Sequence, residues 1–240
     1  MLPRYLVEDY LQHNENMKKI LIVANWKCNP STLKEAKELF NSVEKGIKNV
    51  KNVEVIICPP FTFLGNIEYK TSNIKLGAQD CFWEVRGAFT GEISPTMLKN
   101  LGAEYVILGH SERRKYQKET DGMVNKKMKA VISAGLKPIL CVANLSQLEE
   151  SSKGISEKII VAYEPVFAIG TGKPCPPETA KKMRDKIDYP RVLYGGSVNS
   201  QNAGNYIKEA GFEGLLIGGA SLASKEFIEI VKGVDFISKT

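Results

Sequence analysis

The sequence predicts an α/β fold in one domain, a closed (β/α)8 barrel in which each of eight parallel strands is followed by a helix. Three observations lead to this prediction. From Lys19 onward, short apolar runs rich in β-branched residues alternate with longer stretches of mixed charge. Eight such runs can be counted. The length of 240 residues is also close to the roughly 250 residues of such a barrel.

The predicted strands are dominated by apolar residues and bounded by turn residues, as expected of strands that are buried on both faces. An open, doubly wound sheet would also alternate strands with helices. Such a sheet usually carries a glycine-rich fingerprint after its first strand, whereas here the first strand leads into NWKCN. The strands are expected at residues 20–25, 53–58, 74–78, 105–109, 137–142, 159–163, 191–195 and 214–218.

Helical patterns fill most of the intervals between these strands. Ser31 or Thr32 is placed to cap the first helix, which runs toward Gly46. Ser94 followed by Pro95 opens another helix, because proline is favoured in the first turn. Further helices are expected at residues 121–135, 177–187, 201–211 and 224–233.

Charge, hydropathy and cysteine usage narrow the functional classes. The formal net charge of +6 comes from 33 basic and 27 acidic residues scattered along the chain, whereas nucleic-acid binding usually needs a clustered basic stripe. We therefore expect no nucleic-acid partner, and a mild positive bias suits a small anionic substrate. No apolar run approaches the roughly 18 to 20 residues of a membrane span. The five dispersed cysteines disfavour a zinc site and indicate free thiols in a reducing compartment, the cytoplasm.

The first 17 residues stand apart from the repeating pattern. They lack a long apolar stretch and contain Glu8, Asp9 and Glu15, which disfavours a signal or transit peptide. Met17 directly precedes the first repeating unit. We therefore expect an appendage of unknown role at residues 1–17 and a catalytic barrel at residues 18–240.

Polar residues follow several of the predicted strands, where a barrel of this kind carries its chemistry. His110 and Glu164 are the candidate catalytic pair. His110 precedes a predicted helix start, which favours a neutral ring that donates a hydrogen bond to a carbonyl oxygen. Apolar neighbours surround Glu164, and such surroundings make a carboxylate a better base. A structural histidine and a simple ion pair are the alternatives. The other polar residues at strand ends are Asn25, Lys27 and Glu112.

Two glycine-rich turns are expected on the same rim. Gly195, Gly196 and Ser197 follow the seventh strand, and Gly218 and Gly219 follow the eighth. Backbone N–H groups in such turns form the usual phosphate site of a barrel, because glycine lets the backbone approach the anion closely. These glycines could simply turn the chain, but two such turns on neighbouring strands favour a phosphate site.

Six motifs in this order closely resemble the signatures of the triosephosphate isomerase family: NWKCN, GAFTGEIS, LGHSERR, AYEPVFAIGTGK, YGGSV and GGASL. The resemblance covers about residues 19–233. It implies the interconversion of dihydroxyacetone phosphate and D-glyceraldehyde 3-phosphate through an enediolate, in glycolysis and gluconeogenesis, with no cofactor and no metal. The family is known for a glutamate base, a neutral histidine and a loop that closes over the site.

Carried over motif by motif, the resemblance implies a role for each matched residue. Glu164 moves the proton between two substrate carbons, and His110 polarises the carbonyl group and shuttles protons between the oxygens. Lys27 supplies positive charge, with Glu112 as its supporting carboxylate, and Asn25 shapes the pocket. The phosphate is held by Gly170, in the lid-like segment 165–174, together with Ser197, Gly218 and Gly219.

The chain departs from the family in its outer layer. Only 22 residues separate Cys141 from Glu164, where the family has a full helix, and Ala143-Asn144 replaces a Gly-Glu pair. The sixth helix, between Glu164 and Ser197, is also shorter than in the family. Shortened outer helices are therefore expected after strands five and six, and they bear on stability and assembly more than on chemistry.

The loop from Gln79 to Gly91 carries Phe82, Trp83 and Phe89. Exposed aromatic residues in a long loop suggest a partner surface. In the family this loop inserts beside the neighbour's site, with the residue that matches Thr90 near the neighbour's lysine. A homodimer is therefore implied, with a tetramer as the alternative.

Two other functions compete with the isomerase. The first is a different sugar-phosphate isomerase or lyase barrel; an aldolase would want a lysine on a central strand, whereas Lys27 lies at the rim of the first strand. The second is a non-catalytic phosphate-binding barrel, which would tolerate the loss of a rim residue.

Overall fold

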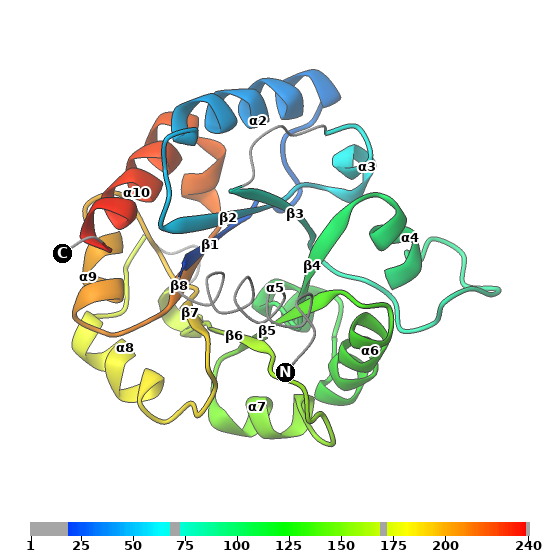
Figure 1. The fold of residues 1–240 in the computed structure, drawn as a ribbon. Coiled ribbons are helices and arrows are strands. Elements are labelled where there is room, and N and C mark those ends of the chain that lie inside the picture. The colour runs from blue at the N-terminus through cyan, green and yellow to red at the C-terminus, as the bar shows by residue number, and fades with distance from the viewer. Residues whose placement is uncertain (1–18, 68–72, 169–171, 239–240) are drawn as a thin grey trace, which may run out of the picture.

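The computed structural model describes residues 19–67, 73–168 and 172–238, and it confirms the predicted barrel (Figure 1). Eight parallel strands pair in sequence order, and the last strand closes on the first. The strands are β1 (Ile20–Asn25), β2 (Val53–Cys58), β3 (Ile74–Ala78), β4 (Ala103–Leu108), β5 (Lys137–Val142), β6 (Ile160–Tyr163), β7 (Val192–Tyr194) and β8 (Gly214–Ile217).

Side chains along each strand alternate between two buried regions. On β1, Leu21 and Val23 belong to the cluster inside the barrel, whereas Ile22 and Ala24 belong to the cluster beneath the helices. Both faces of the sheet are therefore buried, which explains why apolar residues fill nearly every strand position.

The described helices other than α5 surround the barrel in Figure 1, where α5 lies inside that ring beside β5. Those that follow β5 and β6 are short, with 7 and 8 residues against 15 in the first helix, as expected from the sequence. The helices are α2 (Leu33–Ile47), α3 (Phe61–Leu64), α4 (Pro95–Asn100), α5 (Ser111–Tyr116), α6 (Asp121–Ser133), α7 (Leu145–Ser151), α8 (Pro177–Arg184), α9 (Ala203–Lys208) and α10 (Ser224–Ile237), with 3-10 turns η1 (Val166–Ala168) and η2 (Gly219–Leu222).

Several boundaries differ from the sequence-based expectation. The fourth strand begins earlier, at Ala103, and ends at Leu108 because Gly109 adopts a positive φ of 68° that turns the chain. The short helix α3 had not been predicted, whereas α7 is the shortened helix expected after the fifth strand. In α7, Asn144 is the N-cap and accepts a hydrogen bond from the N–H of Gln147, so the Ala-Asn departure from the family pattern starts a helix.

Two expectations concern residues outside the described ranges. These are the appendage at residues 1–17 and the phosphate contact at Gly170. Within the described ranges, no helix has the length and apolar character needed to cross a membrane.

Candidate active site

A cavity of about 240 Å³ lies at the carboxyl ends of the strands. It brings together residues from β1, β4, β6, β7 and β8 that are far apart in the chain. Most of the predicted site residues line it, namely Asn25, Lys27, His110, Glu164, Ser197, Gly218 and Gly219. Glu112 does not line this cavity but pairs with Lys27. Thr90 lies exposed on the loop at residues 79–91, the aromatic loop.

His110 is buried at the start of α5, where it is the N-cap residue. Its Nδ1 accepts a hydrogen bond of 3.2 Å from the backbone N–H of Glu112. A ring that accepts at Nδ1 carries its proton at Nε2 and is neutral. Nε2 lies 3.2 Å from Oε1 of Glu164, so the imidazole is placed to donate there. The backbone of α5 thus favours the neutral ring through a direct hydrogen bond.

Glu164 is only 3% exposed and follows directly after β6. Its Oε2 accepts a 3.0 Å hydrogen bond from the backbone N–H of Ser111. Burial, and then the nearby Glu164 carboxylate, raise the pKa of the Cys141 thiol well above its usual value, so this neighbour stays neutral. Within the described residues, Glu164 pairs with His110. The carboxylate therefore lies in a buried setting with N–H donors around it and no lysine or arginine bound to it within those ranges.

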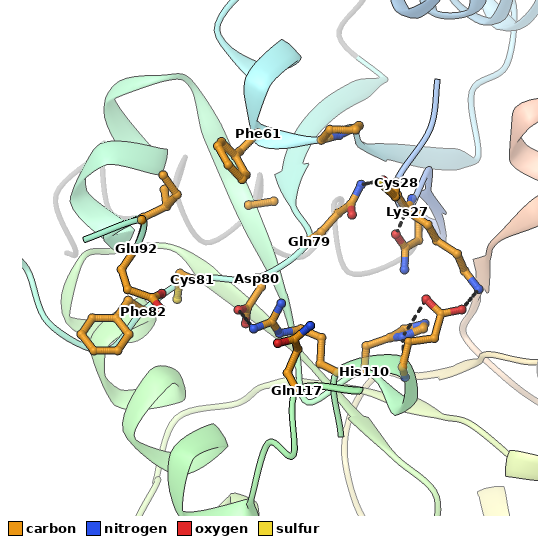
Figure 2. A pocket seen from close by; sticks show the side chains of 17 residues that line it. Lys27, Cys28, Phe61, Gln79, Asp80, Cys81, Phe82, Glu92, His110 and Gln117 are labelled. Atoms are coloured by element: carbon orange, nitrogen blue, oxygen red, sulfur yellow. Dashed lines mark hydrogen bonds and ion pairs between the residues drawn. The ribbon is translucent and has the colours of Figure 1, made fainter. Parts of the chain in front are cut away.

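Lys27 occupies a tight turn after β1, with a φ of 55° that is unusual for a residue other than glycine. Its N–H donates to Oδ1 of Asn25 at 3.0 Å, and its Nζ lies 2.5 Å from Oε1 of Glu112. The side chain of Gln79 also supports this turn, because Nε2 donates to the carbonyl oxygens of Lys27 and Cys58 at 2.8 and 2.9 Å (Figure 2). The sequence analysis did not assign Gln79 to the site. Its position directly after the third strand, on the rim that carries the site, could have indicated this role.

The glycine-rich turn after β8 lies beside this lysine, and the turn after β7 lines the same cavity. A Cβ atom built on Gly218 would be 3.0 Å from Cε of Lys27, so the cationic side chain packs against the turn after β8. The hydroxyl and the N–H of Ser197 both donate to the carbonyl oxygen of Ala168, at 2.7 and 3.1 Å. The Ser197 donors that were expected to hold phosphate are therefore occupied by the segment that follows Glu164.

The described residues contain no group of three or more His, Cys, Asp or Glu that could hold a metal ion. The carboxylate, the neutral imidazole and the cation beside glycine turns are the components of proton-transfer chemistry on a small anion.

The fold and the site together define the chain as a (β/α)8-barrel enzyme whose candidate site lies at the carboxyl ends of the strands. The family model described as Triosephosphate isomerase matches residues 20–234. Triosephosphate isomerase of Caldanaerobacter subterraneus subsp. tengcongensis is 42% identical over 248 residues, covering 90% of this chain and 99% of the relative. That of Aquifex aeolicus is 43% identical over 242 residues, covering 88% and 98%.

Structural comparison gives the same result. The crystal structure of triosephosphate isomerase from Bartonella henselae matches with a TM-score of 0.76 and 33% identity, covering 90% of this chain and 99% of that one. The chain belongs to the triosephosphate isomerase family.

Proposed function

We propose that this chain is a triosephosphate isomerase that interconverts dihydroxyacetone phosphate and D-glyceraldehyde 3-phosphate in glycolysis and gluconeogenesis. The observation that carries the proposal is the pairing of Glu164 and His110 at 3.2 Å in the wall of one cavity. Lys27 and the glycine-rich turns line the same cavity, which supports a phosphorylated substrate. Membership of the family supports the choice of a triose.

In the proposed mechanism, the Glu164 carboxylate removes a proton from the carbon next to the substrate carbonyl group. The Nε2–H of His110 donates to the carbonyl oxygen as negative charge develops, which stabilises the enediolate. Glu164 then returns the proton to the neighbouring carbon, while His110 moves a proton between the two oxygens. One hydrogen moves between the two carbons and one between the two oxygens, and nothing is gained or lost overall, so the chemistry needs no cofactor.

The remaining residues bind and shield the substrate. Lys27 neutralises the phosphate, held in place by Glu112 and next to Asn25. The segment 165–174 closes over the phosphate and keeps water from the enediolate, which suppresses phosphate loss. In this structure the hydroxyl and the N–H of Ser197 donate to the carbonyl oxygen of Ala168. When the segment closes, these two groups donate to a phosphate oxygen instead.

The proposed assembly is a homodimer in the cytoplasm. A second cavity, of about 470 Å³, lies beside the first and is lined by Lys27, Cys28 and Phe61 (Figure 2). In the proposed dimer the aromatic loop of each subunit occupies this cavity of the other subunit. Free thiols, found at all five cysteines, suit a reducing compartment.

The test is a coupled assay with D-glyceraldehyde 3-phosphate on the wild type and on Glu164→Gln. We expect the variant to fold normally and to lose at least about a hundredfold in kcat, as general bases usually contribute. Glu150→Gln removes an exposed carboxylate from α7 and is the matched control. A wild type that is inactive, or that releases inorganic phosphate as its main product, refutes the isomerase. A folded, fully active Glu164→Gln refutes the role of this residue alone.

A further inference from the structure

The two arginines of the LGHSERR motif contact different neighbours and do not form a basic patch. Arg113 pairs with Asp80, with 2.8 Å between Nη2 and Oδ2. Arg114 is directed elsewhere, its side chain is only 14% exposed, and it contacts residues on two other helices. Neither arginine was given a function by the sequence, and the contacts of Arg114 lead directly to the candidate catalytic histidine.

Arg114 binds the carbonyl groups on both sides of His110. Its Nε donates to the carbonyl oxygen of Gly109 at 2.7 Å, and its own backbone N–H donates to the carbonyl oxygen of His110 at 3.1 Å. The first bond orients the peptide plane before the His110 Cα atom, and the second orients the plane after it. These two planes define φ and ψ of His110. The second bond belongs to the backbone of α5, and the N–H of Arg113 donates to the same oxygen at 2.9 Å. The side chain of Arg114 therefore acts on the plane before His110, through the carbonyl oxygen of Gly109.

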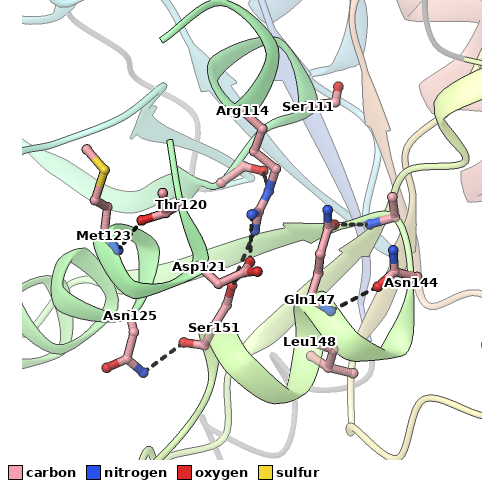
Figure 3. A network of polar contacts seen from close by, with 12 residues as sticks. Ser111, Arg114, Thr120, Asp121, Met123, Asn125, Asn144, Gln147, Leu148 and Ser151 are labelled. Carbon is pink, nitrogen blue, oxygen red and sulfur yellow. Dashed lines mark hydrogen bonds and ion pairs between the residues drawn. The ribbon is translucent and has the colours of Figure 1, made fainter. Parts of the chain in front are cut away.

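The guanidinium group is itself held by two neighbouring helices (Figure 3). Its Nη1 donates to Oδ1 of Asp121 at 2.6 Å, and its Nη2 donates to the hydroxyl of Ser151 at 3.2 Å. The Ser151 hydroxyl in turn donates to the same Asp121 oxygen at 2.8 Å. Asp121 is the first residue of α6, and the fully buried Ser151 is the last residue of α7. The closed triangle leaves the arginine little freedom.

The local backbone is built to accept this arrangement. A Cβ atom on Gly109 would lie 2.9 Å from Nη2 of Arg114, and the φ of 68° at this position also favours glycine. The glycine before the histidine thus makes room for the guanidinium group. Through Ser151, the shortened helix α7 is connected to the rim.

We propose that Arg114 is a positioning residue that holds His110 at its distance from Glu164, and that Asp121 and Ser151 position Arg114. The inference rests on the proposed function, because it requires His110 to act on the substrate. An error in placement of about 1 Å can cost a hundredfold in rate, so the loss of these bonds affects kcat more than binding.

The kinetic test compares Arg114→Gln with Lys115→Gln. The control removes the same charge from the next residue, which is exposed. We expect Arg114→Gln to lower kcat at least about tenfold with KM changed less than about twofold, and the control to match the wild type. In a His110→Gln background, Arg114→Gln should change kcat less than about twofold, because the residue that it positions is gone. An equal loss in both backgrounds, or an unchanged kcat in folded Arg114→Gln, overturns the proposal.

A spectroscopic test does not depend on turnover. The chain has two histidines, so the ¹⁵N imidazole signals of His110 are identified by their loss in His110→Gln. The wild type should show a neutral ring protonated at Nε2, and Arg114→Gln should shift or broaden these signals. Unchanged signals contradict the proposal. If Arg114→Gln does not fold, Ser151→Ala takes its place and should alter the same signals with a smaller loss of kcat. A fully active His110→Gln would refute the proposed role of His110 and leave the spectroscopic result intact.

Discussion

Cys58, at the end of β2, is fully buried in the barrel interior, where the cluster also contains Cys141. Burial raises the pKa of the Cys58 thiol well above its usual value of 9.0. The folded chain therefore keeps this thiol protonated at alkaline pH, whereas the unfolded chain does not. The stabilisation that comes from keeping this thiol protonated is fully present below pH 9 and decreases progressively above it.

We expect the free energy of unfolding to decrease as pH rises above about 9, because proton release then favours the unfolded chain. Each buried thiol adds a slope of about 1.4 kcal/mol per pH unit. Cys58→Ala should make the pH dependence shallower by about that amount. Urea unfolding at one protein concentration measures it, and Cys28→Ala, which removes an exposed thiol, should leave the slope unchanged. Equal slopes for wild type and Cys58→Ala contradict the prediction.

At the scale of the element, the start of α2 shows how a helix is fixed by a few polar atoms. The N–H of Glu35 donates to Oγ1 of Thr32 at 3.2 Å, and the N–H of Thr32 donates to Oε2 of Glu35 at 3.1 Å. This reciprocal pair is a capping box, which satisfies two N–H groups that have no partner within the helix. The neighbouring Ser31 was an equal candidate from the sequence.

Thr32→Ala should therefore lower the free energy of unfolding by about 1 kcal/mol, the usual loss for an N-cap. Ser31→Ala should change it by only a few tenths of a kcal/mol, as expected of a surface substitution. Neither change should alter kcat, because α2 lies in the outer ring, away from the cavity (Figure 1). Urea unfolding of both variants decides the matter, and a larger effect of Ser31→Ala would show that the capping role is misassigned.

At the scale of the whole molecule, the aromatic loop is the feature on which the proposed dimer rests. Phe82 packs against Trp83 and Phe89 with tilted rings, whose centroids lie 4.1 and 4.8 Å from its own. Phe82 and Trp83 are half-buried, so the exposed large apolar residues of the loop are Phe89 and Val85, at 43% and 59%. The sequence had suggested three exposed rings. The smaller apolar tip still faces solvent and suits insertion into a cavity.

Deleting residues 84–89 should yield monomers with kcat lowered by about a hundredfold. In the proposed dimer the loop of the partner supports the Lys27 turn, and small errors in placement are costly. Sedimentation and activity are measured on one dilution series. In the wild type, activity per chain should fall as dimers dissociate. A wild-type chain that sediments as a monomer and retains full activity per chain rules out the proposed dependence on assembly.

The sequence by itself determined the barrel and the place of the main site residues along the chain. A strand buried on both faces must be apolar at nearly every position, and this leaves a local pattern that is visible without a structure. The carboxyl ends of parallel strands meet on one rim, so Asn25, His110 and Glu164 could be expected to lie together. These inferences need only neighbouring residues and one rule of topology.

The tertiary structure alone decided how these residues are held. Lys27 pairs with Glu112 across 85 positions, and Gln79 supports the Lys27 turn across 52. Ser151 reaches Arg114 from another helix, and Thr32 rather than Ser31 caps α2. A hydrogen bond depends on distances of a few tenths of an ångström between groups that are remote in sequence. The periodicity of the sequence does not predict such distances, because they arise only when the closed barrel brings the strand ends and their helices together.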